Sequence, residues 1–159
     1  MGEYVMTTMT IGGVLQGQET IAALIAAAGM YFAEAAPLVN EALTEGRSVA
    51  FEDVQDFGLT PNLDRFCQTH GLPYQRAWIA RPGMFEAGVK FWKPGMGSPV
   101  EEIADEGGQP MMTLAALRNS HDAGETLPAI LARLEKAVAT AVPPLTLANA
   151  AGAARQAAI

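Results

Sequence analysis

The sequence predicts an α+β domain over residues 1–145, with a mixed four-stranded sheet packed by helices and a C-terminal amphipathic helix. Half of the 159 residues are apolar, which is enough for a hydrophobic core. Segments with a two-residue apolar period, typical of strands, alternate with segments that have a helical period. Glycine and proline stand at most of the expected boundaries. The predicted order is strand, two helices, strand, helix, two-stranded hairpin and further helices.

Residues 4–15 are predicted to form the first strand, because threonines alternate there with methionine and isoleucine. Gly12 and Gly13 at its end permit a bulge or a close approach by another backbone. A glycine pair between a strand and a helix also suggests a site for a small anion. Neither glycine-rich phosphate-binding motif is present, so this hypothesis is the weakest of those considered.

Two helices are expected next. Apolar residues recur at intervals of three and four through residues 21–33, which gives one continuous apolar face. Pro37 removes a backbone donor and clashes with the preceding turn, so a second helix should begin there. Gly46 occupies the position of a helix C-terminal cap. Because both faces are rich in alanine, we expect the two helices to pack closely against the sheet.

The second strand is predicted over residues 48–54, and a well-delimited helix follows it. Thr60 suits the N-cap position, and Pro61 suits the first helical residue. Gly71 suits the position that ends the helix. These three signals together predict a helix over about three turns.

A hairpin of two strands is predicted over residues 74–80 and 89–93, a region that holds both tryptophans. Residues 94–110 are rich in glycine, proline and acidic side chains. They are expected to form a long loop with at most one helical turn, at residues 100–105.

The C-terminal part is predicted to be helical. A short helix is expected near residues 114–119, and a longer one over residues 127–141. The apolar stripe of the longer helix is wide, which favours packing on a core over a coiled coil. Residues 146–159 are alanine-rich and are expected to form a frayed tail.

Composition narrows the class of protein. Seventeen acidic and ten basic side chains give a net charge of −7. Without clustered lysine and arginine, binding to a nucleic-acid backbone is disfavoured. A single cysteine excludes an internal disulfide, and neither a secretory signal nor a membrane-spanning apolar run is visible. We therefore expect a cytoplasmic protein with no membrane association.

Two pairs of residues are candidates for catalysis. Cys67 and His70 lie three apart on one predicted helix, so a thiolate–imidazole pair is conceivable. Alternatively, Cys67 belongs to a buried apolar stripe and His70 interacts with the helix C-terminus. His121 and Asp122 lie in a polar stretch between two helices, where a capping role is the alternative. No metal or cofactor motif is found, so no metal and no cofactor are predicted.

The hairpin supplies a candidate surface for a partner, made of Tyr74, Arg76, Trp78, Phe91 and Trp92. Tryptophan, tyrosine and arginine often dominate the energy of protein interfaces. Such a surface could also stack single-stranded bases, although the composition disfavours this. The alternative is that most of these aromatic side chains fill the core beneath the sheet.

No set of chemical residues converges in the sequence. The main hypothesis is therefore a non-enzymatic binding or regulatory module that acts through protein contacts, with another protein or with itself. The alternative is a small hydrolase or transferase that uses either Cys67 with His70 or His121 with Asp122.

Overall fold

A computed structural model describes residues 2–148. Its centre is a six-stranded antiparallel sheet with the strand order β3-β1-β4-β5-β6-β7. A separate pair, β2 and β8, runs parallel. The strands are β1 (Tyr4–Ile11), β2 (Gly13–Leu15), β3 (Val49–Asp56), β4 (Tyr74–Trp78), β5 (Gly88–Trp92), β6 (Val100–Ala104), β7 (Pro110–Met111) and β8 (Leu145–Leu147).

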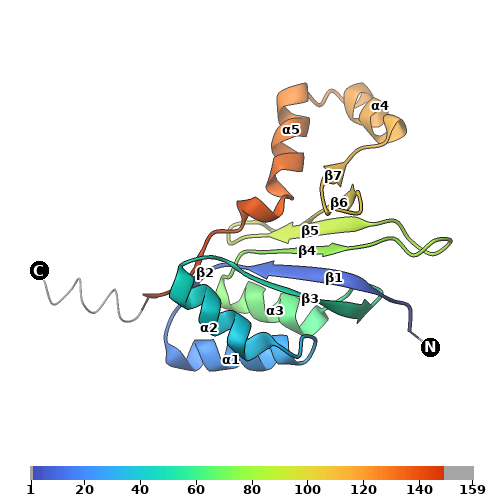
Figure 1. Ribbon diagram of the computed structural model, residues 1–159. Helices are drawn as coiled ribbons and strands as arrows, with labels where there is room; N and C mark the ends of the chain where they lie inside the picture. The colour runs from blue at the N-terminus through green and yellow to red at the C-terminus, as the bar shows by residue number, and fades with distance from the viewer. Residues whose placement is uncertain (1, 149–159) are drawn as a thin grey trace, which may run out of the picture.

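The helices lie on two sides of this sheet. Figure 1 shows the first three together on one face and the last two standing away from the opposite face. The helices are α1 (Gln18–Gly29), α2 (Ala35–Glu45), α3 (Pro61–His70), α4 (Leu114–Asp122) and α5 (Leu127–Lys136), followed by one 3₁₀ turn (Ala139–Ala141). The α+β class predicted from the sequence is confirmed.

The predicted mixed four-stranded sheet is wrong in both strand number and direction. Residues 94–110, expected to form a loop, supply β6 and β7. The apolar Val100 and Ile103 lie three residues apart, which locally suits a helical turn. Instead β6 pairs with β5 in the register Val100 to Phe91 and Ile103 to Gly88. The backbone pairing offered by the edge of β5 decides the outcome, and no local pattern reveals that edge.

The main core lies between the sheet and α1, α2 and α3. Small side chains on the helices, such as Ala28 and Ala42, are fully buried and let the helices approach the strands. The rings of Phe32 and Phe51 stack with their centroids 5.2 Å apart. Further fully buried side chains are Met9, Ile11, Leu15, Leu24, Val39, Leu63, Leu72 and Tyr74.

The predicted helix ends are largely confirmed. Gly46 and Gly71 follow α2 and α3 with φ of 67° and 66°, the left-handed conformation that glycine adopts without strain. Pro61 is the first residue of α3. Thr60 does not cap the helix with its side chain, because its hydroxyl donates to Asp64 Oδ1 at 2.7 Å.

That same carboxylate joins α3 to the sheet through a buried ion pair. Arg76 on β4 is 1% exposed, and its Nη2 lies 2.9 Å from Asp64 Oδ2. A second guanidinium nitrogen, Nη1, donates to the carbonyl oxygen of Gly58. The guanidinium also lies 5.3 Å from the centroid of the Trp78 ring. A buried charge needs such a complete set of partners, so this network fixes α3 and the residues before it against β4.

The first strand is shorter than predicted, because the chain turns at Gly12 and continues as β2. Gly12 N donates to Pro73 O at 3.0 Å, and Gly13 N donates to Pro144 O at 3.1 Å. A Cβ atom on Gly12 would lie 1.7 Å from Pro143 O. The predicted close approach by another backbone is therefore confirmed. Both amides are already engaged, so they offer no donor to the anion considered above.

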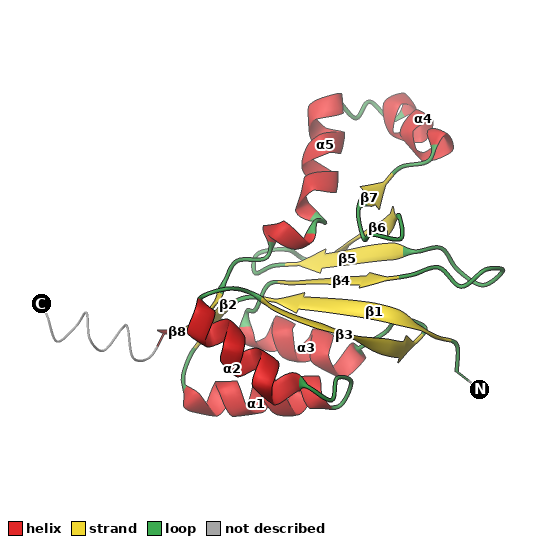
Figure 2. Cartoon of the chain, viewed as in Figure 1, coloured by secondary structure: helices red, strands yellow, loops and turns green. Residues whose placement is uncertain are grey.

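The last two helices form an arm, residues 113–137, that projects from the sheet (Figure 2). The predicted helix over residues 127–141 ends at Lys136, and most of its stripe does not face a core. Only Ile130 is buried within α5, and α4 has no buried residue. Arg133 holds the arm in place with ion pairs to Glu102 on β6 and Glu125. The hydrogen bond from Arg133 lowers the pKa of Glu125.

The C-terminal boundary also differs from the prediction. β8 extends to Leu147, so two residues assigned to the tail pair with β2. The remainder of the predicted tail, residues 149–159, lies outside the described residues. Within residues 2–148, no helix combines the length and apolar character needed to cross a membrane.

Candidate functional site on the open sheet face

The sheet face opposite α1, α2 and α3 carries a groove. Side chains that stand opposite each other on antiparallel strands project from the same face, so the pairing of β3, β1 and β4 arranges the floor in rows. One row holds Glu52, Thr8 and Ala77, and the next holds Thr10 and Gln75. Thr8 and Thr10 of β1, which alternate with apolar side chains in the sequence, are thus part of the polar floor.

The wall of the groove is the turn between β6 and β7. Asp105 Oδ1 accepts hydrogen bonds from Gly107 N and Gln109 N, both at 2.9 Å, which closes the turn locally. Gly108 has φ of 80°, and a Cβ atom there would lie 3.5 Å from Cβ of Ala77. The turn therefore lies directly over β4.

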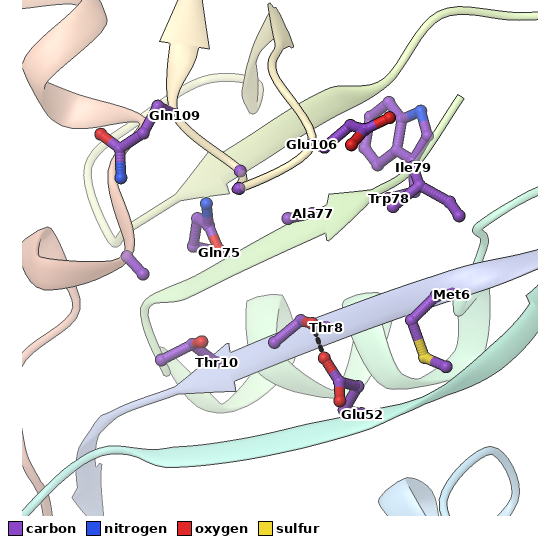
Figure 3. A pocket seen from close by; sticks show the side chains of 13 residues that line it. Met6, Thr8, Thr10, Glu52, Gln75, Ala77, Trp78, Ile79, Glu106 and Gln109 are labelled. Atoms are coloured by element: carbon purple, nitrogen blue, oxygen red, sulfur yellow. Dashed lines mark hydrogen bonds between the residues drawn. The ribbon is translucent and has the colours of Figure 1, made fainter.

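Together the floor and wall enclose a cavity of about 370 Å³. This volume falls at the lower end of the range for ligand sites, about 300–1,000 Å³. Figure 3 shows Gln109 and Glu106 on the side of the turn, and Thr8, Thr10 and Gln75 on the strands. Met6, Ile79 and Ala139 add apolar surface to the lining.

Two polar side chains of the floor are nearly buried without being fully hydrogen-bonded. Thr10 is 6% exposed and Gln75 is 2% exposed. Gln75 Nε2 donates to Ala137 O at 3.2 Å, which assigns the other end of the amide as the acceptor. Among the described residues, neither the Thr10 hydroxyl nor Gln75 Oε1 has a hydrogen-bond partner. Neither atom is itself buried, so both are open to the groove and are available to water or to a ligand.

The charge of the lining is negative. Glu52 and Glu106 both contribute carboxylates, and none of the lysine, arginine and histidine side chains in the described part of the chain lines the groove. Thr8 Oγ1 donates to Glu52 Oε2 at 3.2 Å, which draws this carboxylate toward the floor (Figure 3). The arrangement is an acceptor-rich surface with two negative charges.

The first pair of catalytic candidates lies on α3, beyond the groove lining. Cys67 is fully buried, and burial raises the pKa of its thiol far above the ordinary value. The thiolate, which is the nucleophilic form, is therefore disfavoured. His70 is exposed, and its ring packs on Phe66 with the centroids 4.2 Å apart. Cys67 thus lies in the buried apolar stripe named as its alternative, and His70 lies in the last turn of α3.

The second pair, His121 and Asp122, occupies the last turn of α4, where both side chains are exposed. Neither lines the groove. No group of three or more His, Cys, Asp and Glu side chains in residues 2–148 is placed to hold a metal ion.

The hairpin residues considered for partner binding are mostly inside the protein. Tyr74, Phe91 and Trp92 belong to the two hydrophobic clusters, and burial raises the pKa of Tyr74 to about 12. Arg76 is occupied by its buried ion pair. Trp78 is half-buried, and its Nε1 donates to Glu86 O at 3.1 Å. These positions leave little of Tyr74, Arg76, Phe91 and Trp92 for a partner to contact, whereas Trp78 belongs to the groove lining.

Sequence reasoning missed the groove. The alternation of threonine with apolar residues in β1 was visible, and it indicates a strand with one polar face. Glu52 and Gln75 carry no comparable signal, because they reach the groove only through strand pairing. The wall comes from a segment that was expected to be a loop.

Comparison of the chain with models of protein families, with characterised proteins and with solved structures found no match.

Proposed function

We propose that this protein is a non-enzymatic binding module that acts through protein contacts, and that the groove receives a short segment of a partner protein. The observation that carries this proposal is a pair of acceptor atoms on the side chains of Thr10 and Gln75, which are open to the groove and have no hydrogen-bond partner within residues 2–148. Both acceptors are open to the groove, so a ligand that supplies donors takes the place of water at them.

The surroundings of the groove favour a chain segment as the ligand. β3 is the end strand of the sheet, so its outer edge is unpaired within residues 2–148. The wall stands over β4, on the other side of β1. The groove is therefore bounded on one side and open on the other, which suits a segment that passes across the strands.

The alternative hypothesis, a hydrolase or transferase, receives no support from the candidate residues. A nucleophile needs an accessible side chain with a base within hydrogen-bonding distance. Cys67 is buried with a raised pKa, and His121 and Asp122 lie on the exposed end of α4. Neither pair shares a cavity with the carboxylates of the groove.

A test is to pan a random seven-residue peptide library against the protein and against two leucine variants. Ala77→Leu places a larger side chain on the groove floor beneath the turn, and Ala26→Leu adds the same atoms to an exposed site on α1. We expect selected peptides to bind the parent protein and Ala26→Leu equally and to lose at least about tenfold in affinity for Ala77→Leu. Circular dichroism checks that both variants fold. Equal binding to all three proteins would remove the groove from this proposal.

Self-association is a second candidate, because the arm leaves apolar surface uncovered. Leu114 and Leu117 on α4 are 69% and 41% exposed, and Leu127 and Leu131 on α5 are 63% and 47% exposed. Fully burying an exposed leucine contributes about 1.5–3 kcal/mol, and covering these four side chains would contribute the fraction of that value that their exposure leaves. A helix as short as α4 is also marginal without tertiary packing.

Charge favours a second copy of this chain as the partner. The arm contains three basic side chains and three acidic ones, which cancel, whereas the whole chain carries −7. Two copies can therefore meet through their arms without the repulsion that their other surfaces would cause. Two helical hairpins related by a two-fold axis would form a four-helix arrangement.

Light scattering during size exclusion tests this association at micromolar concentration. We expect a dimer for the unaltered chain and a monomer for Leu131→Glu. Leu59→Glu is the control, because Leu59 is 50% exposed on the loop before α3 and lies outside the arm. A monomeric parent protein, or loss of the dimer in both variants, would refute association through the arm.

A further inference from the structure

We infer that the groove selects a positively charged group that donates hydrogen bonds, namely an alkylammonium or guanidinium ion. This inference rests on the proposed function and adds the chemical class of the bound group. A lysine or arginine side chain of a partner would supply it, and so would a free amine or guanidine. It concerns the groove residues Thr8, Thr10, Glu52, Gln75 and Glu106.

The sign of the charge follows from the lining. Among residues 2–148, Glu52 and Glu106 are the only ionisable side chains in the lining, so an anionic guest would meet two like charges there. A cation would meet two opposite charges, both carried by exposed side chains at the rim of the groove. The groove therefore discriminates between the two signs before any hydrogen bond is considered.

The hydrogen-bonding groups require a guest that donates. Gln75 donates one amide N–H to Ala137 O, and Thr8 donates its hydroxyl proton to Glu52 Oε2. What remains on the floor is mainly acceptors: Gln75 Oε1, the lone pairs of the threonine hydroxyls and the Glu52 carboxylate. Guanidinium offers five donors and no acceptor, and ammonium offers three donors and no acceptor. Both match this surface.

The spacing of the acceptors suits one compact cation. Glu52 and Thr8 share one row of the floor, and Thr10 and Gln75 share the next. Adjacent rows on one face lie two residues apart along a strand, or about 7 Å. A planar guanidinium seated between the rows can turn one edge to the carboxylate and another to Thr10 and Gln75.

The first experiment compares two small probes of nearly equal shape. ¹⁵N-labelled protein is titrated with n-butylguanidinium and, separately, with N-butylurea, which is neutral. We expect the cation to shift the backbone resonances of residues 8–10, 75–77 and 106–109 and the side-chain amide of Gln75. The urea should bind at least about tenfold more weakly.

Matched variants then test the assigned residues. Glu52→Gln removes a carboxylate from the groove, whereas Asp53→Asn removes one from the next residue of β3, which projects from the opposite face. We expect Glu52→Gln to weaken binding of n-butylguanidinium about tenfold or more and Asp53→Asn to change it less than about twofold. Thr10→Val keeps the shape of the side chain and removes the acceptor, so it should also weaken binding.

Each outcome has a defined meaning. Equal shifts from the cation and the urea, or equal effects of the two carboxylate variants, would overturn the cation preference. If the selected peptides still bind Ala77→Leu more weakly than the parent protein, the proposed function would nevertheless stand. If the acetylated, amidated peptide Gly-Thr-Arg-Thr-Gly binds at least about tenfold more tightly than n-butylguanidinium, the cation is part of a chain segment. Equal affinity would assign a free cation as the ligand and would contradict the protein partner.

Discussion

Replacing Asp64 with alanine should lower the free energy of unfolding by about 3–5 kcal/mol. The substitution leaves the guanidinium of Arg76 almost completely buried with no opposite charge, because the Asp64 carboxylate supplies two of the three oxygens that accept its hydrogen bonds. Gly58 O would remain as its main hydrogen-bond partner. Urea denaturation followed by circular dichroism measures the effect as a lower midpoint at unchanged slope.

Two further variants distinguish a buried charge from a general loss of contacts. Glu41→Ala breaks an ion pair with Arg47 of similar length, 3.1 Å, in which both side chains are about half exposed. Exposed pairs contribute little, so its effect should stay below about 1 kcal/mol. Replacing both buried charges, as in Asp64→Leu with Arg76→Met, should cost less than Asp64→Ala alone. Equal stability of Asp64→Ala and Glu41→Ala would show that the pair is unimportant.

The ion pair also connects the core to the groove. Arg76 projects from β4 toward α3, and its sequence neighbours Gln75 and Ala77 project into the groove from the other face. A β4 strand that is loosened on the Arg76 side therefore misplaces the acceptor on Gln75. We therefore expect the loss of Asp64 to disturb the groove on the far face of the sheet as well.

The parts of the fold that sequence predicted are those with local signals. Gly46, Gly71 and Pro61 mark helix ends through their own backbone preferences, and each functions as expected. The alternating pattern of β1 and the periodic apolar residues of α1 are equally local. Such signals need no knowledge of which segments meet.

The features that sequence did not predict depend on distant segments. β6 exists because the edge of β5 is free to pair, and the groove exists because β6 and β7 then turn back over β4. The apolar stripe on α5 predicts burial but not the surface that buries it, and in the structure of residues 2–148 Ile130 is the only residue of α5 that is buried. For the aromatic residues of the hairpin, the sequence does not distinguish packing in the core from binding to a partner, because both roles favour the same side chains.

Replacing Gly12 with alanine should be nearly as damaging as removing Asp64, although it adds only one methyl group. That methyl would lie 1.7 Å from Pro143 O and 2.8 Å from Pro143 C, both backbone atoms. To remove this clash, the segment that leads into β8 must move. That movement would weaken the hydrogen bond from Gly13 N to Pro144 O. We expect a loss of about 3 kcal/mol, the upper end of the usual cost of overpacking.

Gly29→Ala provides the matched control, because no atom outside its own helix lies within 4 Å of the position of the added methyl. At the end of α1, this change should raise stability by about 0.4–1 kcal/mol through the lower entropy of the unfolded chain. Hydrogen exchange locates the damage: Gly12→Ala should speed exchange of the amides of Gly13 and Leu145, which bond to Pro144 and Arg47. Unchanged exchange at both amides would mean that the backbone at Gly12 and the backbone at Pro143 can move apart without loss of stability. A glycine would then not be required at position 12.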